Sequence, residues 1–294
     1  MTTAVVLMAY GSPERLADVP AYYADIRGGR PIPQELLEDL VERYRLLGIE
    51  DGSPLNAITE ETRAALEREL GDVRVFTGMK HWTPRIAEAA DLAVAGGAHA
   101  VVGLVLAPHY SSMSIAGYRT QLEDALRGRA ELAFIESWHD EPDFVELLAD
   151  RVRGTNAHVV FTAHSLPARI LETGDPYKDQ LLDTSQLVAE RAALETWSFS
   201  FQSESQTGEP WLGPDILDHL RELHGRGAQD VLVCPVGFVA DHLEIRWDLD
   251  HEAAQLAADL GLGFRRIEMP NADPAFVQVL AALVRRVLAV PSEA

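Results

Sequence analysis

The sequence predicts an α/β protein made of two doubly wound domains, because short apolar runs alternate with helical patterns almost to its end. The apolar runs are continuous, which is typical of parallel strands covered by helices on both faces. Helical patterns such as those at 83–97 and 214–227 separate them and end at glycines. The runs give two sets of four expected strands, at 4–9, 73–78, 100–107 and 132–137, and at 158–163, 196–201, 230–238 and 263–269.

An internal repeat supports the division into two domains. VVLMAYGSP at 5–13 and VVFTAHSLP at 159–167 share a Val-Val pair, an alanine and a final proline at a constant separation of 154 residues. In this register Tyr10 corresponds to His164, and each lies just beyond an expected strand. Open α/β sheets bind ligands at the carboxyl ends of their strands. We therefore expect the functional site in the cleft between the two domains.

The composition excludes several classes of protein. The chain has 294 residues and a formal net charge of −21, which argues against general nucleic-acid binding. Its single cysteine, Cys234, cannot form an internal disulfide or hold an iron–sulfur cluster by itself. No apolar run approaches the length of a membrane-spanning helix, and the N-terminus lacks the features of a signal peptide. We expect a cytoplasmic protein without stable membrane insertion.

An acidic stripe follows the seventh expected strand, in VGFVADHLEIRWDLDHE at 236–252. Glu244, Asp248 and Glu252 are four residues apart, so a helix would place them on one face, where like charges repel. A solvated helix face is one explanation, but such faces usually mix their signs and this one lacks lysine. The alternative is a row of hard oxygen ligands suited to Fe²⁺ or Mg²⁺. The spacing does not by itself define a closed metal site.

His164 is a second candidate, in the segment TAHSLP at the end of an expected strand. A neutral imidazole there can accept a proton or bind a divalent metal near neutral pH. A purely structural histidine is the alternative. His164 with Ser165 could also suggest a hydrolase, but the G-x-S-x-G motif is missing and the order of residues does not fit one.

A cluster of arginines is a local exception in this acidic chain, in YYADIRGGRPIPQELLEDLVERYRLLGI at 22–49. Arg27 and Arg30 flank a Gly-Gly pair, and Arg43 and Arg45 lie in the amphipathic helix expected after it. Guanidinium groups bind carboxylates or phosphates in bidentate geometry, so the cluster favours an anionic ligand. The alternative is that these arginines pair with the neighbouring acidic residues. No glycine-rich phosphate loop accompanies them.

Seven segments in order resemble the ferrochelatase family along essentially the whole chain. They are MAYGSP (8–13), YYADIRGGRP (22–31), LAPHYSSMSIAGY (106–118), ESWHDEP (136–142), TAHSLP (162–167), QSESQTGEPWLGPD (202–215) and PVGFVADHLEIRWDLDHE (235–252). The resemblance implies a lyase that inserts Fe²⁺ into a porphyrin and releases two pyrrole protons. It also implies the chelatase fold, in which two Rossmann-like domains flank a porphyrin cleft. The family's catalytic and iron-binding pair matches His164 and Glu244, and Asp248 with Glu252 would continue the acidic path.

Within the family, the chain is most similar to the bacterial coproporphyrin III branch of haem biosynthesis, because Tyr10 stands where the protoporphyrin branch usually has an apolar residue. The resemblance implies Fe-coproporphyrin III as product. Coproporphyrin III carries four propionates against two in protoporphyrin IX, which suits several arginines in one cluster. The porphyrin contacts that the resemblance implies are Tyr10, Arg27, Arg43, Tyr44, Ser53 and Tyr118.

Three alternatives remain open at this point. They are a ferrochelatase acting on protoporphyrin IX, a cobalt or nickel chelatase for a reduced tetrapyrrole, and a non-catalytic haem or porphyrin carrier. We expect no tightly bound cofactor, with Fe²⁺ as substrate and the acidic helix as a candidate Mg²⁺ site. We also expect a monomer that passes its product to a downstream enzyme of haem synthesis. The expected domains are 1–153 and 154–272, with a last helix in 273–294 packing on the first domain.

Overall fold

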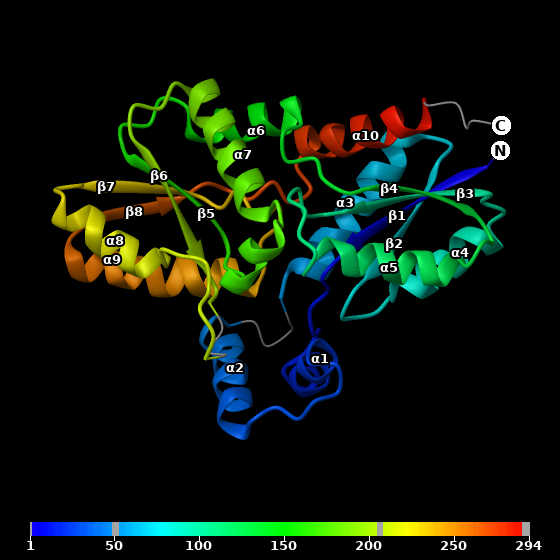
Figure 1. Ribbon diagram of the computed structural model, residues 1–294, viewed down its shortest axis with the longest axis horizontal. Coiled ribbons are helices and arrows are strands. Elements are labelled where there is room, and N and C mark those ends of the chain that lie inside the picture. The colour runs from blue at the N-terminus through cyan, green and yellow to red at the C-terminus, as the bar shows by residue number, and fades with distance from the viewer. Residues whose placement is uncertain (1, 49–52, 205–207, 290–294) are drawn as a thin grey trace.

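The computed structural model describes residues 2–48, 53–204 and 208–289, and within them the chain forms two four-stranded parallel sheets (Figure 1). The strand orders are β2-β1-β3-β4 and β6-β5-β7-β8, so the two sheets have the same topology. The fold class and all eight expected strands are confirmed, and the shared order agrees with the repeat in the sequence. The strands are β1 Thr3–Ala9, β2 Arg74–Met79, β3 Ala100–Val105, β4 Glu131–Ile135, β5 His158–His164, β6 Trp197–Gln202, β7 Asp230–Cys234 and β8 Gly263–Arg266.

Some strands are shorter than the sequence predicts. The apolar run 230–238 reads as one strand, but β7 ends at Cys234. Pro235 follows it, and a proline cannot donate a hydrogen bond to a sheet. The remaining apolar residues of this run form the loop that leads to the acidic stripe.

Helices cover both faces of each sheet, as continuous apolar strands predict. Along β1, Val6 and Met8 pack on α4 and α5, whereas Val5 and Leu7 belong to the core on the opposite face, with α3 and α10. The helices are α1 Val19–Ile26, α2 Gln34–Leu46, α3 Leu55–Leu70, α4 Ile86–Ala95, α5 Ile115–Leu126, α6 Pro142–Val152, α7 Tyr177–Ala192, α8 Ile216–Gly225, α9 Ala254–Leu260 and α10 Pro274–Leu288.

A single hydrophobic core joins the two sheets. It contains Val5 and Leu7 of β1 together with Val159 and Phe161 of β5, and α6, α7 and α10 contribute to it as well. The last helix, α10, lies on α3 and α6, and the guanidinium of Arg285 binds the carbonyl and carboxylate oxygens of Glu69 at 2.7 Å. The two halves therefore share buried apolar surface. The domain boundaries at 153 and 272 stay predictions.

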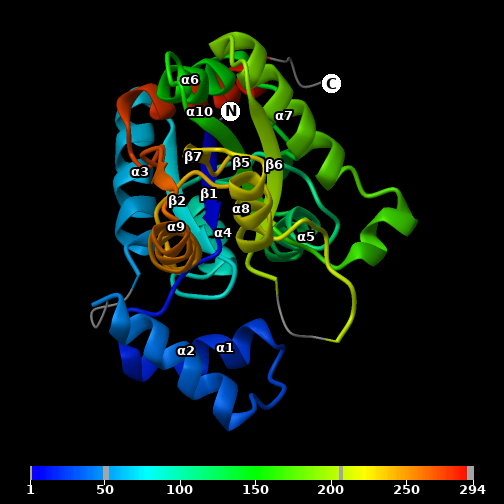
Figure 2. The ribbon, with the colours of Figure 1, turned by 90° about the vertical axis from the view of Figure 1, so that its left-hand side faces the viewer.

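Helices α1 and α2 stand apart from both sheets (Figure 2). The Tyr22 hydroxyl donates to the Gly11 carbonyl at 2.8 Å, and Asp25 forms an ion pair with Arg85 at 3.0 Å, which ties α1 to the first domain. A small apolar cluster around Val19 and Tyr44 packs on Leu243 of the second domain. The α1–α2 hairpin thus bridges the two domains at the carboxyl ends of their strands.

None of the helices within the described ranges combines the length and the hydrophobicity that a membrane span requires.

Candidate active site

The main candidate residues lie beyond the carboxyl ends of the two sheets. Tyr10 directly follows β1, and His164 is the last residue of β5. Glu244 directly precedes a π-helix, Ile245–Ala253, which follows the loop after β7. The shared strand order therefore brings Tyr10 and His164 to equivalent positions in the two domains.

His164 and Glu244 form a pair that is accessible to a ligand. The Nε2 atom of His164 lies 3.5 Å from Oε1 of Glu244, and the two side chains are 31% and 38% exposed. His242 approaches the same carboxylate, with its Nε2 atom 3.7 Å from Oε2. The sequence analysis did not single out His242. Its position two residues before Glu244 could have indicated that His242 lies near the same carboxylate.

Hydrogen bonds to backbone carbonyls orient both imidazoles. Nδ1 of His164 contacts the carbonyl oxygen of Ser165, and Nδ1 of His242 lies 2.9 Å from the carbonyl oxygen of Ala240. A carbonyl can only accept, so each Nδ1 must carry the proton. The Nε2 atom of each ring is then the atom directed at Glu244.

The pair is ionised at neutral pH. Burial alone would lower the pKa of His164, but the charge of Glu244 and the hydrogen bonds to Glu244 and Ser165 raise it to about 9. Burial would raise the pKa of Glu244, yet the charge and hydrogen bond of His164, with those of His242, hold it well below its usual range. The pair therefore consists of an imidazolium, protonated on both ring nitrogens, and a negatively charged carboxylate.

The middle residue of the acidic stripe, Asp248, does not lie on a solvated helix face. Asp248 is buried and accepts a hydrogen bond from the Gln202 amide at 3.2 Å and another from the Ser203 hydroxyl. Burial and the charge of Glu244 raise the pKa of Asp248 to about 7. The helix expected here is a π-helix over its first nine residues, a conformation often found at functional sites.

Among the described residues, no group of three or more His, Cys, Asp or Glu side chains is arranged to hold a metal ion. The iron ligands His164, Glu244, Asp248 and Glu252, and the Mg²⁺ site on the same helix, therefore stay predictions.

Tyr10 lies beyond the end of β1, beside His81 and within the influence of the Glu244 charge. Its side chain is 42% exposed, and its ring centroid lies 4.6 Å from that of His81. Burial within the cleft, followed by the charges of Glu244 and Asp25, raises the pKa of the Tyr10 phenol far above its ordinary value. The phenol is neutral, and it lies within the electrostatic field of Glu244.

The arginine cluster divides into two kinds of residue. Arg43 pairs with Asp39 at 3.0 Å, and Arg45 pairs with Glu42, as expected if these arginines bind neighbouring acidic residues. Arg43 also lies 5.1 Å over the ring of Trp247, so it contacts the π-helix of the second domain. Arg27 differs, because its Nε atom is buried and has no hydrogen-bond partner among the described residues. An unpaired buried guanidinium nitrogen is the group that an anionic ligand would satisfy.

The other three porphyrin contacts that the resemblance implies, Tyr44, Tyr118 and Ser53, are all buried. Tyr44 is buried in α2, and burial raises the pKa of its phenol to about 12, although a hydrogen bond from Ser12 opposes the change. Tyr118 is buried in α5, with the Lys80 ammonium 4.8 Å from its ring centroid. Ser53 is buried at the start of α3, where its hydroxyl accepts from the amide of Leu55 at 3.4 Å. Within the described ranges, no hydrogen bond or ion pair joins Ser53 to His164 or Glu244.

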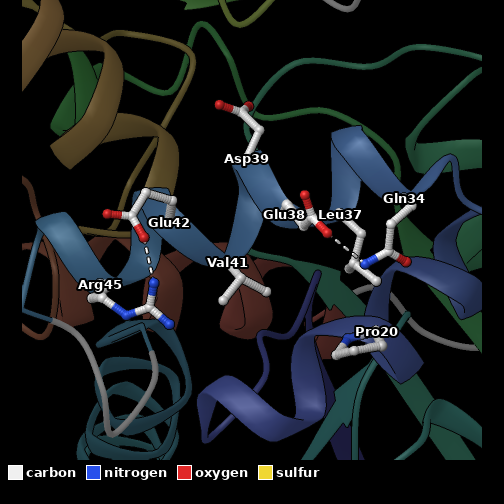
Figure 3. Close-up of a pocket in the computed structure, with 8 residues that line it drawn as sticks. All are labelled: Pro20, Gln34, Leu37, Glu38, Asp39, Val41, Glu42 and Arg45. Atoms are coloured by element: carbon white, nitrogen blue, oxygen red, sulfur yellow. Dashed lines mark hydrogen bonds and ion pairs between the residues drawn. The ribbon is translucent and has the colours of Figure 1, made fainter.

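A separate hollow of about 540 Å³ lies along α2 (Figure 3). Pro20, Leu37 and Val41 form its apolar side, and Glu38, Glu42 and Arg45 are among its polar residues. None of the candidate catalytic residues lines it. The hollow is on the α1–α2 hairpin and not at the strand ends, so it is distinct from the candidate active site.

Comparisons with known proteins identify the family of this chain. The family model described as Ferrochelatase matches residues 2–288. A ferrochelatase from Herpetosiphon aurantiacus is 44% identical over 300 residues, covering 96% of this chain and 98% of its own. A coproporphyrin III ferrochelatase from Halalkalibacterium halodurans is 40% identical over 302 residues, covering 97% of each chain. The solved structure "SirB from Bacillus subtilis with Fe3+" has a TM-score of 0.62 at 12% identity, covering 98% of this chain and 96% of its own, which shows a shared fold. The chain belongs to the ferrochelatase family, metal chelatases of the lyase class.

Proposed function

We propose that this ferrochelatase inserts Fe²⁺ into coproporphyrin III to give Fe-coproporphyrin III, with His164 and Glu244 as the catalytic pair. The observation that carries the catalytic assignment is the accessible imidazole–carboxylate pair at 3.5 Å, with Tyr10 at the equivalent strand end of the first domain. The substrate assignment is supported by the relatives named coproporphyrin III ferrochelatases at about 40% identity. The Nε atom of Arg27, buried and without a partner among the described residues, suits a propionate, which either porphyrin would supply.

The charges of the site suggest the order of proton transfers. His164 holds a proton at neutral pH because Glu244 stabilises it. An arriving Fe²⁺ ion would compete with that proton for the Glu244 carboxylate and would favour neutral His164. The Nε2 proton of His164 would then leave to solvent, to which the side chain is 31% exposed. Since Nδ1 bonds to the Ser165 carbonyl, the freed lone pair is on Nε2, where it can accept a pyrrole proton.

Asp248 is suited to receive the next proton. Its pKa of about 7 allows it to bind and release a proton near neutral pH. Glu244 stands four residues before it and Glu252 four residues after it, and both charges contribute to that raised pKa. We propose that the two pyrrole protons leave by way of His164 and Glu244, then Asp248 and Glu252.

The test is anaerobic metallation followed by visible absorption. Native protein is mixed with Fe²⁺ and either coproporphyrin III or protoporphyrin IX. We expect the free-base bands to collapse faster with coproporphyrin III. A preference for protoporphyrin IX would overturn the proposed substrate and leave the enzyme class unchanged.

The carrier alternative is separated by Glu244→Gln. A carrier would keep its porphyrin affinity and show no turnover before or after the change. For the chelatase we expect turnover in the native protein and its loss in Glu244→Gln, with porphyrin affinity retained. Fluorescence quenching of the porphyrin measures the affinity independently of the reaction.

A further inference from the structure

A buried carboxylate connects the first domain to α7 of the second. Asp175 is 8% exposed, and its Oδ2 atom accepts hydrogen bonds from the Ser112 amide at 2.7 Å, the Ser112 hydroxyl at 2.7 Å and the Ser111 hydroxyl at 3.1 Å. Both serines lie in the loop between β3 and α5 of the first domain. These hydrogen bonds outweigh burial and keep the pKa of Asp175 below its ordinary value. The carboxylate is therefore a charged acceptor at the domain interface.

The same carboxylate fixes the start of α7. Its Oδ1 atom accepts a hydrogen bond at 3.0 Å from the amide of Tyr177, the first residue of α7. The Tyr177 side chain is also buried, and its hydroxyl donates to the main-chain carbonyl of His164 at 3.0 Å. A continuous chain of hydrogen bonds thus runs from Ser112 through Asp175 and Tyr177 to the backbone of His164.

The position of that backbone decides where the imidazole points. His164 is the last residue of β5, and its Nδ1 atom bonds to the carbonyl of the next residue, Ser165. Ser165 is itself held by its amide, which donates to Gln202 at 2.7 Å, and by its hydroxyl, which donates to Leu212 at 2.7 Å. The carbonyl of His164 is the remaining group by which a neighbouring element holds this peptide, and Tyr177 binds it.

We propose that Asp175 and Tyr177 are positioning residues for His164, and that they couple its placement to the β3–α5 loop of the first domain. The inference rests on the proposed catalytic role of His164. It adds a reason why the two domains must keep a fixed relation: the loop that holds Asp175 also leads into α5, which carries Tyr118. One loop would then influence both a porphyrin contact and the catalytic imidazole.

The primary test is Tyr177→Phe, which removes the hydroxyl and keeps the ring. We expect kcat for metallation to fall about threefold to tenfold, the range that one lost hydrogen bond gives in rate, with KM for porphyrin unchanged. Tyr110→Phe is the matched control, because Tyr110 lies at the same interface and its hydroxyl makes no hydrogen bond with the described residues. Equal effects of both changes, or a rise in KM alone, would overturn the proposal.

A double-mutant cycle tests the path itself. Ser112 and Tyr177 share no hydrogen bond and are connected through Asp175. We expect the effects of Ser112→Ala and Tyr177→Phe on kcat to be non-additive, whereas independent sites would give additive effects. Asp215→Ala is the control for a carboxylate at a helix start, since Asp215 is the N-cap of α8 and accepts the Leu217 amide at 2.8 Å within the second domain. A loss of kcat in Asp215→Ala equal to that in Asp175→Ala would show an effect of the helix start alone and would overturn the proposal.

A spectroscopic measurement keeps this proposal separate from the proposed function. The imidazole resonances of His164 are identified in the nuclear magnetic resonance spectrum as those that disappear in His164→Ala. We expect Tyr177→Phe to shift them and Tyr110→Phe to leave them in place, whether or not coproporphyrin III is the substrate. Unchanged His164 resonances in Tyr177→Phe would overturn the positioning role even in a fully active chelatase.

Discussion

The carboxyl ends of β1 and β5 occupy equivalent places in two sheets of the same strand order, yet they carry opposite chemistry. Tyr10 presents a neutral phenol beside the ring of His81, which follows β2. His164 presents a protonated imidazole beside Glu244, which follows β7. The neighbouring group comes from one side of the central strand in the first domain and from the other side in the second. The repeat supplies the position, and the following loops supply the chemistry.

The largest expected effect on turnover comes from replacing His164 at the end of β5. We predict that His164→Ala lowers kcat for metallation by about 10²- to 10⁴-fold, the range for losing a general acid–base group. Tyr10→Phe removes one hydroxyl at the equivalent position, and we expect a much smaller loss. Stopped-flow absorption with coproporphyrin III measures both rates. Comparable losses at the two positions would mean that the two strand ends share the proton chemistry.

The pH dependence of kcat/KM should also distinguish the role of His164 from that of Tyr10. The pKa of His164 is raised from 6.5 to about 9, so its neutral form becomes more populated as pH rises toward 9. We predict that kcat/KM rises with pH over this interval, because neutral Nε2 is the proton acceptor. In Glu244→Gln the carboxylate charge is lost, so the pKa of His164 should fall from about 9, while the Ser165 carbonyl and the Asp248 charge continue to raise it. Imidazole titration by nuclear magnetic resonance measures that change, and a pKa that stays near 9 would contradict the assigned cause.

The same shift has a consequence for stability. A folded-state pKa above the unfolded value means that the ion pair stabilises the chain fully below about pH 6.5. This contribution is lost as pH rises through about 9. We predict that the stability difference between the native chain and His164→Ala shrinks between these limits, in denaturant unfolding measured at several pH values. A difference that does not vary with pH would indicate that the pair contributes no net stability.

Much of the fold follows from the sequence, because strand and helix patterns are local. The continuous run at 158–163 predicts β5 and the end of the strand at which His164 lies. Local patterns do not reveal how a loop returns to the site. The approach of His242 to Glu244, and the burial of Asp248 against Gln202 and Ser203, depend on where the chain after β7 packs.

The sequence also does not predict the π-helix at Ile245–Ala253. Glu244, Asp248 and Glu252 have helical spacing, which does not distinguish a π-helix from an α-helix. The sequence likewise does not show which arginines are paired with acidic residues. Their number indicates an anionic ligand. Only the structure shows that Arg43 pairs with Asp39, whereas the Nε atom of Arg27 is buried and has no partner among the described residues.

The smallest effect we predict concerns the contact between the two regions. Arg43 lies on α2, in the hairpin tied to the first domain, and its guanidinium lies 5.1 Å over the ring of Trp247, in the π-helix that follows Glu244. Arg43→Lys keeps the charge and loses the planar stacking and the bidentate geometry. We expect KM for coproporphyrin III to rise about twofold to fivefold with little change in kcat, because a cation–π contact contributes roughly 0.5–1 kcal/mol.

Arg45→Lys is the matched control, since Arg45 lies on the same helix, pairs with Glu42 and lines the hollow shown in Figure 3. It should leave both constants unchanged. If Arg43→Lys lowers kcat and leaves KM unchanged, Arg43 acts on the His164 end through Trp247. The α1–α2 hairpin would then link the chemistry of the two strand ends, in addition to binding the porphyrin at the first.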